Sequence, residues 1–227
     1  FAATSQGFWK TLNGGIVWYR VLSGSVRDFE FNTANPDIMY LGRDRFFIST
    51  DGGESFDQVT DNMPSFSQIG RISVAVTPAN SDYVYLLISD DDTAGFLGIY
   101  RSTDGGLTFS ERTTSPNILS SSYDGDGEGG QGWYDLALAV DPEDENHIFT
   151  GGVNIWESFN GGGTMQILAH WVYDNGPYVH ADVHQLDYFN GRLFCASDGG
   201  LFSSNNNGNS FTNRSEGLEI TQCYRIG

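Results

Sequence analysis

The chain contains 227 residues, of which 29 are acidic and 11 are basic, so its formal net charge is −18 at neutral pH. This acidity disfavours nucleic acid and anionic membranes as partners, because both repel a negatively charged surface. No stretch of about 18 consecutive apolar residues occurs, so we expect no membrane-spanning segment. An extracellular, calcium-rich setting suits this charge, and the length suits one all-β domain.

From the N-terminus onward, one twelve-residue pattern returns five times without gaps, beginning at Gly7, Arg45, Gly98, Asn154 and Gly200. Each copy has Ser or Thr, then Asp or Asn two residues later, then Gly after two more, and closes on a large apolar side chain. The pattern predicts a β-hairpin, because Gly accepts the positive φ of a tight turn and Asp or Asn can bond its backbone N–H groups. We interpret these polar positions as structural. They are Asn13, Asp51, Asp104, Asn160 and Asn206.

Before each later hairpin, the sequence predicts an alternating strand, a turn, and a second apolar strand, so that each unit has four strands. A four-stranded antiparallel unit that recurs about every 40 to 55 residues is typical of a β-propeller blade. We therefore predict an all-β propeller, with no helical periodicity. The expected units are the last strands of a partial blade over 1–22, whole blades over 23–60, 61–117, 118–169 and 170–215, and the first strand of a further blade over 216–227.

Propellers with units of this length usually need more blades to close, and the chain begins at Phe1 without Met or a signal peptide. We therefore expect it to be part of a larger propeller and a larger protein. The alternative is a compact five-bladed ring in which the two partial blades close on each other.

The pattern Ser-x-Asp-x-Gly-x-x-Phe, as in Ser49–Phe56, resembles the Asp-box (BNR) repeat of sialidases, sortilin-type receptors and xyloglucanase-type glycoside hydrolases. The stretches GQGWYDLALAVDP, GGVNIWESFNGG and VHADVHQLDYF are similar to a group of large secreted bacterial propellers that often carry a type IX secretion sorting domain. The resemblance covers almost the whole chain and implies a secreted or cell-surface protein with further domains as partners. Met165 and Asn206 depart from the usual residues of the repeat, so we expect looser hairpins there.

The stretch HADVH places His180, Asp182 and His184 at alternate positions of a strand that should be the innermost of its blade. Alternation would put all three side chains on one face. Two imidazoles and a carboxylate could bind Zn²⁺ or another transition metal, with His170 as a fourth ligand. In the alternative interpretation, the histidines bond neighbouring backbone and carboxylate groups inside a polar channel.

The loop SYDGDGEGGQGW has Asp124, Asp126 and Glu128 at alternate positions among glycines. Oxygen ligands on a flexible backbone suit Ca²⁺, so the loop is a candidate calcium site. The rest of an EF-hand pattern is missing, and a solvated, flexible insertion is the alternative.

Glycoside hydrolysis requires two carboxyl groups at a defined separation across the sugar. The candidates on predicted innermost strands are Asp135, Asp182 and Asp187, with Asp28 beside them. Sialidase activity would also require an arginine cluster that grips the substrate carboxylate. The innermost strands supply Arg27, Arg71 and Arg225, but no Tyr–Glu pair accompanies them, which disfavours a sialidase.

Cys195 and Cys223 fall on predicted strands of neighbouring blades. They could form a disulfide, or each could be a buried small apolar residue, so the cysteines leave the redox compartment open.

Trp133, Trp171 and Tyr178 lie outside the repeated hairpins and are candidate ligand-binding aromatics. We predict a non-catalytic secreted or cell-surface module that acts as a scaffold or binds protein or glycan. The alternative is a xyloglucanase-like glycoside hydrolase acting on polysaccharide. An enzyme should show two carboxyl groups facing one open cleft, at least one with a raised pKa. Function should lie where the repeats differ, in the 115–135 insertion and between His170 and His184.

Overall fold

The computed structural model describes residues 1–172 and 176–218, and the regular structure in this part of the chain is entirely β. The first sheet contains β1 (Ala2–Thr4), β2 (Gly7–Lys10) and β3 (Tyr19–Ser23). The second contains β4 (Asp28–Phe31), β5 (Met39–Gly42), β6 (Phe46–Ser49) and β7 (Asp57–Val59). The third contains β8 (Ile69–Val76), β9 (Val84–Asp90), β10 (Phe96–Ser102) and β11 (Ser110–Thr113).

Two further sheets follow along the chain. The fourth contains β12 (Ala137–Val140), β13 (Ile148–Gly151), β14 (Ile155–Ser158) and β15 (Gln166–Ala169). The fifth contains β16 (Val183–Phe189), β17 (Arg192–Ser197), β18 (Gly200–Ser204) and β19 (Thr212–Asn213). Within every sheet, each strand pairs antiparallel with its neighbour in sequence, so each sheet is a simple meander.

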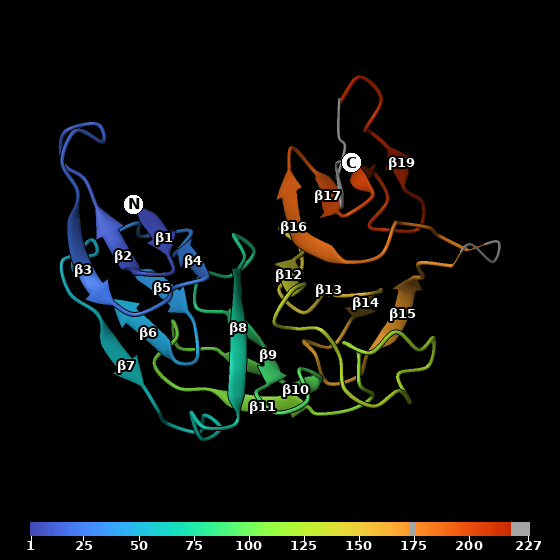
Figure 1. The fold of residues 1–227 in the computed structure, drawn as a ribbon, viewed down its shortest axis with the longest axis horizontal. Helices are drawn as coiled ribbons and strands as arrows, with labels where there is room; N and C mark the ends of the chain where they lie inside the picture. Colours follow the sequence, from blue (N-terminus) through green and yellow to red (C-terminus); the bar gives the residue numbers. More distant parts are fainter. Residues whose placement is uncertain (173–175, 219–227) are drawn as a thin grey trace, which may run out of the picture.

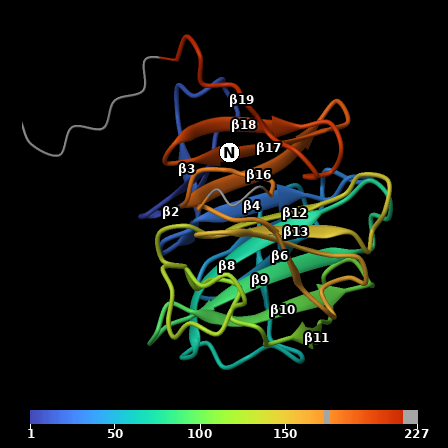
Figure 2. The same ribbon diagram turned by 90° about the vertical axis from the view of Figure 1, so that its right-hand side faces the viewer.

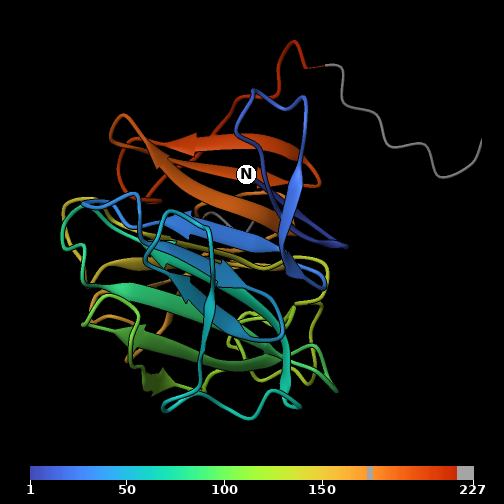
Figure 3. The same cartoon turned by 90° about the vertical axis from the view of Figure 1, so that its left-hand side faces the viewer.

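The four-stranded sheets are arranged around a common middle, as propeller blades are. Their first strands contact one another in succession, β4 with β8, β8 with β12, and β12 with β16. Figure 1 shows these four strands facing the middle of the molecule. In the side views, the sheet β16–β19 lies at the top and the sheet β8–β11 at the bottom, with β4 and β12 at similar heights between them (Figures 2 and 3). The prediction of an all-β fold built from four-stranded antiparallel blades is confirmed.

Apolar side chains fill the spaces between neighbouring sheets. Each pair of adjacent sheets shares one buried cluster, represented by Phe8 with Leu41, Tyr40 with Ile72, Leu87 with Leu138, and Phe149 with Leu186. The hydrophobic core therefore consists of successive layers, because each sheet packs its faces against the sheets that precede and follow it.

The repeated hairpin forms the turn between the third and fourth strands of each four-stranded sheet. In the first intact copy, Ser49 Oγ donates to Asp51 Oδ1 at 2.7 Å and accepts from Gly53 N at 3.0 Å. Asp51 Oδ1 accepts from Ser55 N at 3.0 Å, and the Ser55 hydroxyl donates to Asp51 Oδ2. These hydrogen bonds, led by that from the Ser55 hydroxyl, lower the pKa of Asp51.

The two hairpins that we expected to be looser keep part of this hydrogen-bond pattern. Gly162 N donates to Ser158 Oγ at 3.0 Å in the copy closed by Met165, and Gly208 N donates to Ser204 Oγ at 2.8 Å in the copy with Asn206. The side-chain oxygens of Asn160 and Asn206 each accept from a single turn N–H group, that of Thr164 and that of Ser210. Asp51 Oδ1 accepts from two, Glu54 N and Ser55 N, so the two Asn hairpins have one turn hydrogen bond fewer.

The first sheet differs from the prediction in detail. We expected only the last strands of a blade over 1–22, but β1 is an additional strand paired with β2, and Val17 lies in the turn between β2 and β3. Among the described residues, no helix has the length and apolarity needed to span a membrane. Cys195 is a buried free thiol whose pKa is raised by burial to about 12, and Cys223 lies outside the described residues.

The meander sorts the connections onto two faces. We call the end of the sheets where β4, β8, β12 and β16 begin the loop face, because it carries the connections 60–68, 114–136 and 170–182 between successive sheets. The opposite end carries the repeated hairpins and is called the hairpin face. Both segments that we expected to carry function therefore emerge on the loop face.

Candidate functional site

The 114–136 insertion is fixed by hydrogen bonds. The Asn117 amide group donates to Gly127 O at 2.9 Å and to Gly129 O at 2.7 Å, and its oxygen accepts from Phe96 N. The neighbouring connection of the third sheet also holds it, since Gly130 N donates to Thr93 O at 3.2 Å. A Cβ at Gly130 would lie 2.8 Å from two carbonyl oxygens, so only glycine permits this approach. The insertion therefore has a defined conformation.

A cavity of about 440 Å³ lies between this insertion and the segment that leads into β16. We call it the Trp171 cavity. Its apolar wall includes the Trp171 side chain, which is 43% exposed. Its polar wall includes Glu128, Gln131 and Asp182. An exposed indole beside carboxylate, amide and hydroxyl groups suits a polar ligand that has one apolar face.

Gln131 connects two of the predicted carboxyl groups. Its Nε2 donates to Asp135 Oδ2 at 3.2 Å and to Asp182 Oδ1 at 2.5 Å. Asp135 is 1% exposed, and burial raises its pKa to about 7. Asp135 does not line the Trp171 cavity, whereas Asp182 does. The carboxyl group with the raised pKa is therefore out of reach of a ligand in this cavity.

A second set of hydrogen-bonded polar side chains, Tyr134, His184 and Asp198, lies close to Gln131, Asp135 and Asp182. The Tyr134 hydroxyl donates to Asp198 Oδ2 at 3.0 Å, and His184 Nε2 lies 2.7 Å from Asp198 Oδ1. The rings of Tyr134 and His184 meet edge to face with centroids 4.8 Å apart. These contacts join the insertion to the fifth sheet and orient His184.

The predicted transition-metal site is not assembled. β16 begins only at Val183, and Asp182 has a left-handed φ of +64°, so His180, Asp182 and His184 do not alternate along one strand. His180 Nδ1 lies 3.1 Å from Ala181 O, and His170 Nδ1 accepts from Val172 N. Over residues 1–172 and 176–218, no three His, Cys, Asp or Glu side chains gather as metal ligands would.

The predicted calcium site at Asp124, Asp126 and Glu128 is also not assembled in the described residues. Asp124 accepts a hydrogen bond from Asp126 N at 3.4 Å, and hydrogen bonding from Asp126 lowers the pKa of Asp124. Glu128 lines the Trp171 cavity instead of joining these two residues at a cation site. The three acidic side chains therefore do not converge.

Asp187 lies apart from Asp135 and Asp182. It lines a cavity of about 280 Å³ together with Glu30 and Tyr188, near the ends of the first strands. Burial, followed by the charges of Asp28 and Asp187, raises the pKa of Glu30 to about 8. The structure thus brings Asp135 and Asp182 together through Gln131 and places Asp187 apart from both.

The aromatic candidates also differ in their surroundings. Trp133 is 63% exposed and lies against Tyr134, with ring centroids 5.4 Å apart. Tyr178 packs on the core between the fourth and fifth sheets and meets Phe202 edge to face. Trp133 and Trp171 are therefore available for ligand contact on the loop face, while Tyr178 contributes to the core.

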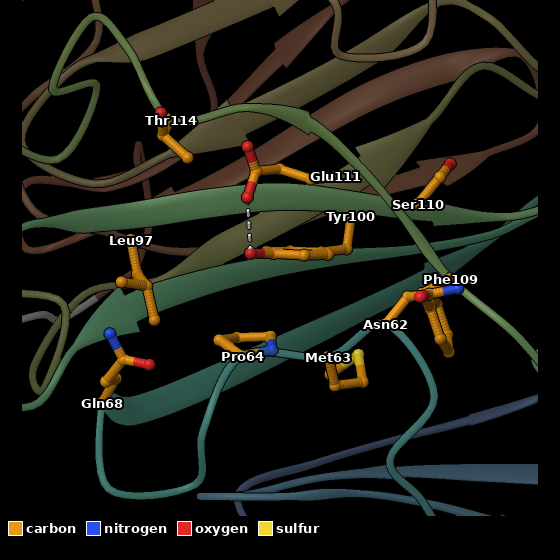
Figure 4. A pocket seen from close by; sticks show the side chains of 10 residues that line it. All are labelled: Asn62, Met63, Pro64, Gln68, Leu97, Tyr100, Phe109, Ser110, Glu111 and Thr114. Atoms are coloured by element: carbon orange, nitrogen blue, oxygen red, sulfur yellow. Dashed lines mark hydrogen bonds between the residues drawn. The ribbon is translucent and has the colours of Figure 1, made fainter.

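A larger cavity of about 620 Å³ lies at the rim, between the 60–68 connection and strands β10 and β11 (Figure 4). The Tyr100 hydroxyl donates to Glu111 Oε2 at 3.0 Å within it, and burial raises the pKa of Tyr100 to about 12. Met63, Pro64 and Phe109 form its apolar wall. None of the residues predicted from the sequence lines this cavity.

Sequence reasoning missed Gln131, Tyr134 and Asp198. All three are isolated polar residues in irregular segments, and no spacing pattern marks them. They become recognisable only when the fourth and fifth sheets are placed side by side. The nearest signal was the failure of residues 115–135 to follow the repeat.

No family model matches the sequence, and no curated protein matches it. Among solved structures, a GH74 enzyme of Niastella koreensis is similar over 93% of this chain and 34% of its own, with a TM-score of 0.61 and 18% identity. The GH74 xyloglucanase of Xanthomonas campestris matches over 93% and 31%, with a TM-score of 0.60 and 18% identity. YCF48 bound to a D1 peptide matches over 86% and 57%, with a TM-score of 0.56 and 13% identity.

These similarities identify the fold as a β-propeller. The chain spans about a third of the length of the two GH74 enzymes and somewhat more than half of YCF48. At this level of identity the similarity establishes the fold alone.

Proposed function

We propose that this chain is a non-catalytic module of a secreted or cell-surface propeller protein, and that its loop face binds glycan or protein partners. The observation that supports this most directly is the Trp171 cavity, which is built from the two segments that depart from the repeat. An exposed indole beside fixed polar groups is a common means of holding a sugar ring. The cavity is therefore assigned to a glycan.

We further propose that the five hairpins are Asp-box repeats and that the parent protein is exported, with type IX secretion as the route. The recurring hydrogen bonds of Asp51 and its counterparts support the first part. The net charge of −18 and the secreted bacterial proteins that the sequence resembles support the second. We also propose that the blades have the boundaries predicted from the sequence, and that the parent protein contains further blades.

A xyloglucanase-like hydrolase is the second candidate. Glu128 and Asp182 both line the Trp171 cavity, so two carboxyl groups face one open site. The buried Asp135 carboxyl, with its raised pKa, does not face that site. This arrangement favours binding over hydrolysis, which needs a protonated acid in contact with the glycosidic oxygen.

Titration calorimetry with xyloglucan heptasaccharide and cellotetraose tests the binding proposal. Replacing Trp171 by Ala should weaken binding about tenfold through loss of the stacking surface. Replacing Phe189 by Ala should leave binding unchanged, because this aromatic residue is even more exposed than Trp171 but lies at the far end of β16. Equal binding by wild type and the Trp171 variant, or no binding by wild type, would reject the glycan site.

A reducing-end assay on the same sugars separates the two candidates. We expect no product from wild type. Product that disappears in Asp182→Asn would replace the binding proposal with the hydrolase.

A further inference from the structure

Two arginine side chains meet at the centre of the loop face. Arg27 and Arg71 line a small polar cavity of about 40 Å³, which we call the axial cavity. Its walls come from all four inner strands and include Asp28 of β4, Ser73 of β8, Leu138 of β12 and His184 of β16. The cavity therefore lies on the axis around which the blades are arranged.

Neither guanidinium group forms an ion pair with a carboxylate in the part of the chain that the structure describes. Arg27 Nη1 donates to Trp133 O at 2.9 Å, and Arg71 Nη1 donates to Tyr134 O at 3.2 Å. Arg71 Nε is buried and has no hydrogen-bond partner among the described residues. Buried donors without partners are rare in proteins, so the hydrogen-bonding capacity of this guanidinium group is not fully used here.

The carboxyl groups around the axial cavity compensate the arginines poorly. Burial raises the pKa of Glu30 to about 8 and raises the pKa of Asp28 as well. Asp28 also has its own partners, since its Oδ2 accepts from Ser73 Oγ and Val74 N at 2.8 Å. Burial and then the neighbouring Arg27 charge lower the pKa of Arg71, and the charges of Asp28 and Asp135 oppose this effect only in part. An anion in the cavity would relieve this repulsion.

We propose that the axial cavity binds one carboxylate group, supplied by the C-terminus of a peptide chain. The volume of about 40 Å³ holds roughly three or four water-sized groups, since each needs about 10–15 Å³, and a carboxylate has three heavy atoms. Guanidinium groups bind carboxylates through paired, charge-assisted hydrogen bonds. The exposed Trp133, whose carbonyl Arg27 already holds, provides an apolar contact for the last side chain of the peptide.

The charge of the whole protein favours a chain end over an acidic polysaccharide. A net charge of −18 repels a polymer that carries an acid on every sugar. A peptide has only one terminal carboxylate, and its upstream residues can be basic. This site is distinct from the Trp171 cavity, so it can fail or succeed independently of the glycan proposal.

The test uses a library of basic hexapeptides that vary in their last two residues, each made with a free C-terminal acid and with a C-terminal amide. Fluorescence polarisation should show that wild type binds the best acid about ten- to a hundredfold more tightly than its amide. Arg71→Gln and Arg27→Gln should each abolish most of this preference. Arg192→Gln, which removes the same charge from an exposed position on β17, should retain it.

Arg27 is exposed, so its variant keeps the experiment informative if Arg71→Gln does not fold. Equal binding of acids and amides by wild type would overturn the proposal. Retention of the preference in both arginine variants would do the same. Arginine-dependent binding of trigalacturonate without binding of any peptide acid would overturn the peptide as the source of the carboxylate.

Discussion

At the scale of single residues, His147 is a buried histidine with a carboxylate beside each ring nitrogen. Its Nδ1 lies 3.1 Å from Asp141 Oδ2 and its Nε2 lies 3.2 Å from Glu157 Oε2, and all three residues are buried. The ring also stacks on Phe159, with centroids 4.4 Å apart. Burial alone lowers the pKa of His147, but hydrogen bonds to the two carboxylates outweigh it and raise the pKa above 6.5.

This environment predicts a pH-dependent loss of stability in His147→Gln. A histidine whose folded pKa is raised stabilises the fold fully below its unfolded pKa, and the contribution disappears as pH rises through the folded value. The substitution should therefore lower the free energy of unfolding by about 3 kcal/mol near pH 6, because it leaves two buried carboxylates without their cation. The loss should be smaller near pH 9.

Urea unfolding of both proteins at the two pH values measures this difference. His170→Gln is the matched control, because His170 is only partly buried and contacts no carboxylate in the described residues. A loss for His147→Gln that is the same at both pH values would show that the ring acts only by packing.

At the scale of the element, the repeated hairpin connects neighbouring blades as well as closing its own. Tyr40 of β5 donates its hydroxyl to Gly105 O in the hairpin of the next sheet, at 3.1 Å. Arg112 of β11 donates to Asn160 O and Gly161 O in the hairpin after that. The hairpins of the third and fourth sheets therefore pack on the preceding blade.

Two adjacent glycines of one hairpin separate backbone strain from packing. Gly105 and Gly106 have φ values of +75° and +89°, so Ala strains the backbone at either position by about 1–2 kcal/mol. A Cβ at Gly105 would meet nothing within 4 Å, whereas one at Gly106 would lie 2.9 Å from the Tyr40 ring. Gly106→Ala should therefore destabilise the protein more than Gly105→Ala.

The denaturant midpoints of the two glycine variants decide this point. Equal midpoints would mean that the hairpin does not pack tightly on the preceding blade. A lower midpoint for Gly105→Ala would contradict the proposed contact outright.

The hairpins could be predicted from the sequence because their cause is local. Asp51 and Gly53 satisfy a turn within a few residues of each other, and the pattern is visible in the printed chain. Where a strand begins depends less on local sequence. The alternation of His180, Asp182 and His184 predicted a strand through all three residues, but the left-handed backbone at Asp182 prevents it. Arg27 and Arg71 were identified as inner-strand arginines, but their approach to each other depends on how successive blades are placed around the axis.

At the scale of the whole molecule, the two faces have different tasks. The hairpin face repeats the same turn in every blade and holds the sheets together. The loop face carries the connections that differ, and with them the Trp171 cavity and the axial cavity. A propeller can in this way keep its scaffold constant and vary its binding surface through the loops.

The central claim is that ligands bind the loop face. The most direct test is hydrogen–deuterium exchange of the wild-type chain with and without saturating xyloglucan heptasaccharide. Slower exchange in residues 117–136 and 176–184, with unchanged exchange in the five hairpins, is the predicted result. Slower exchange confined to the hairpins, or no change anywhere, would contradict the assignment of function to the loop face.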